Sequence, residues 1–331
     1  MEHSLDLTYH WAGFSALVVF VIAYAFVMAE EFTHLRKSKP VVLAAGLIWG
    51  MIAIAYSNTP HYEMVEHEIR HSFLEYTELA FFLLVAMTYI NALEERNVFN
   101  SLKSWLIKNQ FSYRQLFWIT GVLAFFLSPL ADNLTTALVL CAVVVAVGSS
   151  SPKFVGLACV NIVVAANAGG AFSPFGDITT LMVWQAGQLD FLQFFALVIP
   201  SVVNYIIPAS IMHFFVSDHK PDVAETSVTI KYGGKTIILL GLLTIVTAVS
   251  FHNFLHLPPV FGMMTGLAYL QLYSFYIKIS VKDIEEQKYD FFENVARVEW
   301  DTLLFFFGVI LSVGGLGFID RKSTRLNSSH Q

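Results

Sequence analysis

The stretch Ser128-Pro-Leu-Ala-Asp-Asn-Leu-Thr-Thr136 places an aspartate and a proline between two apolar runs. The stretch Asn167-Ala-Gly-Gly-Ala-Phe-Ser-Pro-Phe-Gly-Asp-Ile-Thr-Thr180 does the same within a longer apolar run. Proline removes a backbone donor and glycine loosens a helix, so the carbonyl and amide groups freed at such breaks must face protein or a cavity. We therefore expect a re-entrant hairpin over residues 116–147 and a broken helix over residues 154–184.

Outside these breaks the chain is strongly apolar. Of its 331 residues, 56% are hydrophobic and 13% are charged, against roughly 25% charged in soluble domains. A single globular core cannot enclose this excess, so we predict an all-α polytopic membrane protein. The formal net charge of −6 does not indicate nucleic-acid binding. The expected apolar segments are residues 11–28, 41–56, 73–93, 116–130, 134–147, 154–184, 191–215, 236–251, 259–277 and 303–318.

The distribution of basic residues predicts the orientation in the membrane. Of the 19 Lys and Arg residues, 15 fall in loops on one side of the expected spans. Cytoplasmic loops carry the excess of positive charge, so we expect the N-terminus outside. Cys141 and Cys159 each lie in an apolar run, and we interpret them as small apolar filler rather than as a disulfide or metal motif.

A weak internal repeat points to transport. Residues 75–85 share Glu, Leu, Phe, Phe and Val with residues 299–309 at a constant offset of 224. The charge count makes the two copies run in opposite directions, as in inverted-repeat transporters. We expect a partial transmembrane domain over residues 1–319, with a first repeat at about 72–216 and an incomplete second repeat at about 299–319. The polar string 320–331 resembles a translated sequencing adapter, and we expect a C-terminally truncated chain with a non-native tail.

Two intramembrane carboxylates form the candidate site. Asp132 and Asp177 each cost roughly 2.5 to 3.5 kcal/mol at the bilayer centre, so such residues usually serve a function. Carboxylate, hydroxyl, amide and carbonyl oxygens together suit a hard cation such as Na⁺. Each hydroxyl or amide taken alone is equally explained by bonding across helices, and the glycine pair by close packing. The surrounding oxygen donors are Ser128, Asn133, Thr135, Thr136, Asn167, Ser173, Thr179 and Thr180.

These motifs, together with Phe81-Phe-Leu-Leu-Val-Ala-Met-Thr-Tyr-Ile90, resemble the NhaD sodium/proton antiporters of the ion transporter superfamily over residues of about 10 to 319. The resemblance implies a bacterial inner-membrane homodimer that exchanges cytoplasmic Na⁺ or Li⁺ for external H⁺ and is not an enzyme. It implies no cofactor and no structural metal. It also implies broken helices at a site formed by Ser128, Asp132, Asn133, Asn167, Asp177, Thr179 and Thr180.

A shared carboxylate explains antiport, because burial raises the pKa of an aspartate until a proton and a cation compete for it. Several alternatives remain open. Another carrier of the superfamily would move arsenite or a dicarboxylate, although no arginine inside an apolar segment offers an anion clamp. An Asp132–Asp177 protease dyad lacks its glycine signature. His67-Glu-Ile-Arg-His71, expected in an external loop, matches the H-E-x-x-H pattern of zinc proteases. His61, His67 and His71 would alternatively sense pH, or would simply belong to a solvated helix end.

Overall fold

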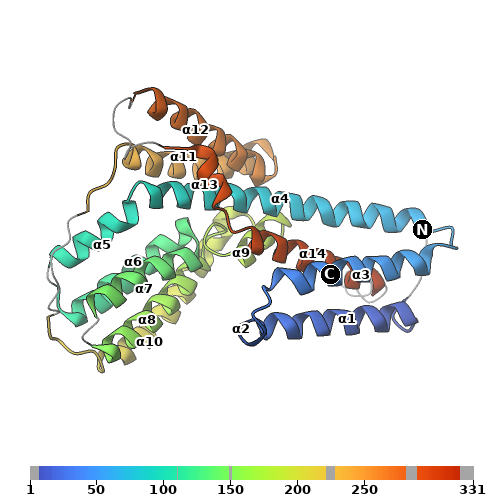
Figure 1. Ribbon diagram of the computed structural model, residues 1–331, viewed down its shortest axis with the longest axis horizontal. Helices are drawn as coiled ribbons and strands as arrows, with labels where there is room; N and C mark the ends of the chain where they lie inside the picture. Colours follow the sequence, from blue (N-terminus) through green and yellow to red (C-terminus); the bar gives the residue numbers. More distant parts are fainter. Residues whose placement is uncertain (1–6, 110, 149–150, 221–227, 281–288, 321–331) are drawn as a thin grey trace. The chain divides into compact units, whose positions relative to one another are not determined.

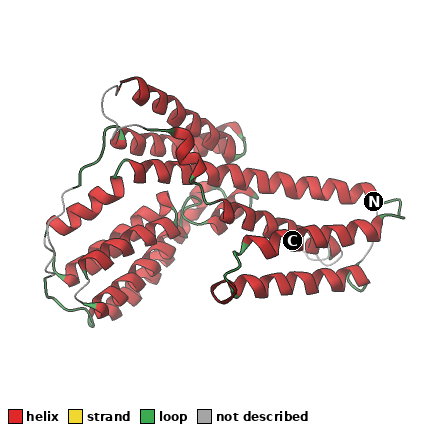
Figure 2. Cartoon of the chain, viewed as in Figure 1, coloured by secondary structure: helices red, strands yellow, loops and turns green. Residues whose placement is uncertain are grey.

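The computed structural model describes residues 7–109, 111–148, 151–220, 228–280 and 289–320. All regular structure in these ranges is helical (Figure 2). Nine helical segments in this part of the chain are long and apolar enough to cross a membrane, which confirms an all-α polytopic architecture. The elements are α1 (Trp11–Met28), α2 (Glu30–Thr33), α3 (Ser38–Tyr56), α4 (Tyr62–Glu95), α5 (Val98–Lys108), α6 (Tyr113–Ala131), α7 (Asn133–Val147), α8 (Pro152–Gly170), α9 (Ile178–Gln185), the 3₁₀ helix η1 (Phe191–Leu197), α10 (Val198–His213), α11 (Gly234–Leu255), α12 (Pro259–Ser280), α13 (Phe291–Ala296) and α14 (Trp300–Ile319) (Figure 1).

Helix α4 begins earlier than the apolar pattern predicts. It has 34 residues and includes the stretch from His67 to His71, so this stretch is helical and not a loop. The charged residues continue the helix because they are spaced one turn apart. The Arg70 guanidinium pairs with Glu66 at 2.7 Å, and His71 Nδ1 lies 3.5 Å from Glu75 Oε1. Such i, i+4 pairs support the exposed side of these first turns, while Val65 is buried on the other side and Met64 and Ile69 pack against the same core.

The chain forms two compact units, and their boundary lies within α4. The first unit contains residues 7–83 and 299–320, with α1, α3, the start of α4 and α14. Its core includes the wholly buried Ile48, Ile52 and Tyr56 of α3, which pack with Leu311 and Phe318 of α14. The indole Nε1 of Trp49 donates to the Leu311 carbonyl at 2.8 Å.

The second unit spans residues 84–298 and contains both helix breaks. Helices α6, α7, α8 and α10 share one core within it (Figure 1). Helices α11 and α12 form a closely packed pair, and Tyr89 of α4 bonds to both. The Tyr89 hydroxyl donates to the Gly266 carbonyl of α12 at 2.7 Å and accepts from the Thr244 hydroxyl of α11 at 2.9 Å. Most of the expected non-native tail, residues 321–331, lies outside the described residues.

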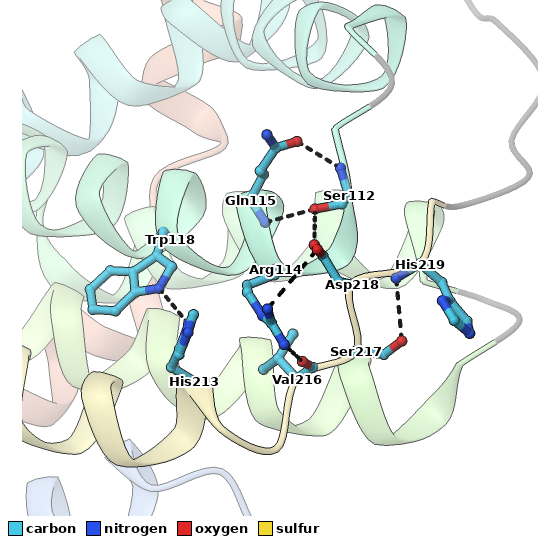
Figure 3. Close-up of polar contacts among 9 residues, drawn as sticks. All are labelled: Ser112, Arg114, Gln115, Trp118, His213, Val216, Ser217, Asp218 and His219. Atoms are coloured by element: carbon cyan, nitrogen blue, oxygen red, sulfur yellow. Dashed lines mark hydrogen bonds and ion pairs between the residues drawn. The ribbon is translucent and has the colours of Figure 1, made fainter.

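The start of α6 is fixed to the end of α10 and the segment that follows it (Figure 3). Ser112 caps α6, and its hydroxyl also donates to Asp218 at 2.8 Å. One turn further on, Trp118 Nε1 donates to His213 Nδ1 at 3.0 Å. Arg114 donates to the Val216 carbonyl at 3.2 Å. These contacts fix the N-terminal end of α6, the helix whose C-terminal end leads into Asp132.

Candidate functional site

The first break is a single residue, Asp132, between α6 and α7. Its backbone has φ 54° and ψ 158°, a region that residues with a side chain seldom adopt and that costs roughly 1–3 kcal/mol. Its carboxylate caps α7 by accepting from the Thr135 amide at 2.8 Å and from the Thr135 hydroxyl at 2.8 Å. An aspartate held in such a conformation at a helix start is a candidate for function.

The second break separates α8 from α9. It interrupts the long apolar run at residues 154–184, where the sequence predicts a broken helix. Asp177 caps α9 and accepts from the Thr179 amide and the Thr179 hydroxyl, both at 3.0 Å. The Thr180 hydroxyl donates to the carbonyls of Ser173 at 2.9 Å and Asp177 at 2.8 Å. Both aspartates therefore lie at helix N-termini, where the helix dipole stabilises negative charge.

Asn133 joins the two breaks. Its backbone amide donates to the Gly176 carbonyl at 3.0 Å. Its side-chain amide donates to Asp177 Oδ2 at 3.1 Å and to Asn167 Oδ1 at 3.2 Å. The residue next to Asp132 thus contacts the second carboxylate directly, and one site contains groups that are 44 residues apart in sequence.

Close packing of α6 against α8 makes this contact possible. A Cβ added to Gly169 would lie 2.1 Å from the Phe125 carbonyl oxygen, and one added to Gly170 would lie 2.7 Å from the Gly176 carbonyl oxygen. The Ser128 hydroxyl donates to the Ala166 carbonyl at 2.6 Å. Only glycine lets the two backbones approach this closely, so the glycine pair serves packing as well as position.

Nine of the ten predicted site residues fall into two groups, and Thr136 belongs to neither. Asp132, Asn133, Thr135, Asn167, Asp177, Thr179 and Thr180 supply the hydrogen-bonded groups at the two helix starts and the end of α8. Ser128 and Ser173 donate to backbone carbonyls of the neighbouring segment, Ser173 to Pro129 at 3.0 Å, which ties the breaks together. Thr136 is buried, and its hydroxyl has no partner among the described residues.

The remaining candidates are placed elsewhere. His67 and His71 lie on α4 in the first unit, and His61 lies just before that helix. The contact of His71 with Glu75 is local to the helix surface. The structure therefore adds no support for these histidines as part of a metal site.

A second polar group inside the same core was not predicted. Asn161 of α8 is wholly buried, and its side-chain amide donates to the Phe117 carbonyl of α6 at 2.9 Å. Gly121 leaves room for it, because an added Cβ would lie 2.4 Å from Asn161 Nδ2 and 2.5 Å from the Tyr205 hydroxyl. The available signal was a lone Asn between apolar residues at 157–166, which periodicity alone does not mark as special.

A helical membrane protein with two discontinuous helices that meet at carboxylates defines the class of polytopic membrane transporters. A family model described as "Citrate transporter" matches residues 11–319. The chain is 52% identical to the "Na(+)/H(+) antiporter NhaD" of Vibrio cholerae, over 96% of this chain and 71% of that protein. It is also 52% identical to the protein of the same name from Alkalimonas amylolytica, over 95% of this chain and 70% of that protein.

The chain therefore belongs to the family that this model describes and, within it, to the NhaD Na⁺/H⁺ antiporters. A more distant relative is "Sodium/proton antiporter 1" of Arabidopsis thaliana, 31% identical over 90% of this chain and 51% of that protein. The family is one of transporters, so the two protease interpretations of the sequence are set aside.

Proposed function

We propose that the chain exchanges cytoplasmic Na⁺ or Li⁺ for external H⁺ across the bacterial inner membrane. The observation that carries this proposal is the Asn133 contact, which joins the Asp132 break to the Asp177 carboxylate. The close relatives support it, since they bear the name of Na⁺/H⁺ antiporters and come from bacteria.

The exchange follows from competition for carboxylate oxygens. In this structure the Asn133 side-chain amide donates to Asp177 and to Asn167. A half-turn of the Asn133 side-chain amide would exchange the positions of its NH2 group and its oxygen. The oxygen would then point at an ion held by Asp177. The carboxylates would then hold either a proton or a cation, but not both. Mutually exclusive occupancy of one site, reached alternately from each side, produces antiport.

The architecture that we propose retains the sequence expectations that remain untested. Helices α6 and α7 would form a hairpin that starts and ends on the cytoplasmic side. Helix α6 alone is long enough to cross a membrane, but α7, with 15 residues, is shorter than a full span. The N-terminus would lie outside, by the distribution of basic residues. Residues 72–216 and 299–319 would belong to inverted repeats, and the chain would act as a homodimer, as the resemblance implies.

An anionic cargo is the second candidate, because the family model is described as a citrate transporter. The sequence shows no arginine inside an apolar segment, but among the described residues Arg96 is buried, with 1% of its surface exposed. Its guanidinium pairs with Glu95 at 2.9 Å and lies 4.7 Å from the centre of the Tyr289 ring. Arg96 comes directly after the last residue of α4 and is distant in sequence from both breaks. Its guanidinium is already paired with the Glu95 carboxylate. Two aspartates at the breaks favour a cation.

Everted vesicles from cells without their own antiporters test the proposal. A pH-sensitive dye reports whether Na⁺, Li⁺ or K⁺ collapses a preformed proton gradient. We expect collapse by Na⁺ with the chain, and at least tenfold less with Asp132→Asn or Asp177→Asn. Asp190→Asn is the matched control, since it makes the same change at an exposed cap of η1. Full Na⁺ response in Asp132→Asn would overturn the site, and citrate- or arsenite-driven flux without a cation response would favour the second candidate.

A further inference from the structure

The hydrogen bond between Trp118 of α6 and His213 of α10 requires one protonation state of the histidine (Figure 3). The indole Nε1 carries a hydrogen and can only donate, so the ring atom that it meets must have a free lone pair. At 3.0 Å from Nε1, His213 Nδ1 is that acceptor. The bond therefore exists only while His213 is neutral, since protonation of Nδ1 would set two N–H donors against each other.

Both partners are positioned by the helices that carry them. Trp118 comes six residues after Ser112, the cap of α6, and His213 is the last residue of α10. The two ring centres are 6.0 Å apart, and His213 is half-buried. Trp118 also meets the buried ring of Tyr205 edge-on at 6.3 Å, so its indole contacts two residues of α10. The Trp118–His213 bond thus depends directly on how α6 packs against α10.

The charged contact nearest to this bond does not require a neutral histidine. Arg114 of α6 donates to the Val216 carbonyl at 3.2 Å, and its guanidinium lies 4.0 Å from the Asp218 carboxylate. The remaining charged or titratable residues on the elements that pack here are Tyr113 of α6, Lys153 and Cys159 of α8, and Lys220 after α10. Histidine is the side-chain type that changes charge between about pH 5 and 8, so His213 and the exposed His219 are the two residues to distinguish.

We propose that the Trp118–His213 bond is a proton-sensitive latch on the cytoplasmic end of α6, and that its opening in acid lowers Na⁺-dependent flux. This proposal rests on the exchange and the orientation proposed above, by which this end of α6 faces the cytoplasm. From the latch, α6 runs on to Asp132, and its Phe125 carbonyl lies against Gly169 of α8. Release of the start of α6 therefore loosens the helix that leads into the first break.

The latch would open under the condition in which exchange is harmful. Each cycle of the proposed exchange brings protons into the cytoplasm. When the cytoplasm is already acidic, further exchange would acidify it more. A histidine on the cytoplasmic end of α6 titrates with that compartment and would slow the exchange there.

The state of the bond is measured first, without transport, on the full chain in detergent. An imidazolium beside an indole quenches its fluorescence, so the Trp118 emission should fall between pH values of about 8 and 5.5. This emission is obtained as the difference from Trp118→Phe. His213→Asn should abolish the fall, because its side-chain oxygen occupies the place of Nδ1, accepts from Trp118 and takes up no proton. His219→Asn, which removes the exposed histidine nearby, is the matched control and should keep the fall.

The effect on flux is measured in everted vesicles, in which the cytoplasmic face meets the bath and the bath pH sets the state of the latch. Compared with the unaltered chain, His213→Asn should give equal Na⁺-dependent flux at a pH of about 8.5 and at least about twofold more at a pH of about 6. In a Trp118→Phe background, His213→Asn should change flux at neither pH, because the bond is already absent. A role in packing alone would shift flux equally at both pH values.

Three results would separate the explanations. A Trp118 emission that does not change with pH, or that changes equally in His213→Asn, would overturn the latch. Equal pH profiles of flux for the unaltered chain and His213→Asn would overturn its effect on exchange. Absence of Na⁺-dependent flux at every pH, with the change in emission intact, would refute the proposed exchange rather than the proton-sensitive bond.

Discussion

Substitution of Gly169 by alanine is the most direct test of how α6 and α8 create the site. The added Cβ would lie 2.1 Å from the carbonyl oxygen and 2.8 Å from the carbonyl carbon of Phe125. Ordinary contacts begin at 3.4 Å, so the two backbones must separate by about 1.3 Å. Neither partner is the end of a flexible side chain that could turn away, so the helices themselves must move.

The cost follows from overpacking, which is typically about 1–3 kcal/mol and lies near the upper value when backbone is the obstacle. At roughly 2 °C per kcal/mol for a chain of this size, we expect the midpoint of thermal unfolding to fall by about 6 °C. The change also moves Asn167, two residues away, relative to Asp132 on the other helix. A displacement of about 1 Å in a preorganised site can cost about 100-fold in rate, so Na⁺-dependent flux should fall by at least tenfold.

Gly156→Ala is the matched control on the same helix. An added Cβ at Gly156 meets nothing within 4 Å, and alanine favours a helix over glycine by about 1 kcal/mol. This variant should melt at the same temperature or about 2 °C higher and retain full flux. Thermal unfolding of the purified variants and dye quenching in everted vesicles measure both properties. Equal melting and equal flux for the two variants would refute the close approach of α6 and α8.

Three further outcomes are expected. Asn133→Ala removes both side-chain bonds between the breaks, at about 0.5–1.5 kcal/mol each, so the Na⁺ concentration for half-maximal flux should rise about tenfold in the vesicle assay. Ser112→Ala removes the cap of α6 and should lower the free energy of unfolding by about 0.5–2 kcal/mol in a denaturant titration, with little change in ion affinity. Burial and the Glu95 carboxylate raise the pKa of Tyr289, whose buried hydroxyl has no hydrogen-bond partner among the described residues. Tyr289→Phe should therefore leave stability unchanged or raise it by up to about 1 kcal/mol, equally at pH values of about 6 and 9, and a loss at either pH would contradict this.

The sequence predicted the positions of the breaks because their cause is local. Pro129 lies in the last turn of α6, and Gly170 is the last residue of α8, so each break falls within a few residues of a helix breaker. An aspartate beside such residues has few structural uses in lipid. The all-helical class followed from composition for the same reason. These properties depend on neighbours in sequence and need no knowledge of packing.

The contacts of the site could not be predicted, because they depend on the register between helices. Asn133 was only one of several oxygen donors in the sequence, and its bond to Asp177 requires α7 and the segment before α9 to meet. Asn161 was missed for the same reason, since its bond to the Phe117 carbonyl depends on which faces of α6 and α8 adjoin. The early start of α4 was missed because charged residues interrupt its first turns, although Val65 and Ile69 there pack into the core.

The unusual backbone at Asp132 means that folding and the proposed transport mechanism favour different residues at one position. Glycine adopts a positive φ without penalty, so Asp132→Gly would remove strain of roughly 1–3 kcal/mol, partly offset by loss of the cap on α7. A directed-evolution campaign that rewards heat resistance alone would tend to enrich this substitution and discard the proposed ion site. Growth of antiporter-deficient cells in high salt is the counter-selection that would keep the aspartate. Stabilised variants for structure determination should therefore be screened with both criteria.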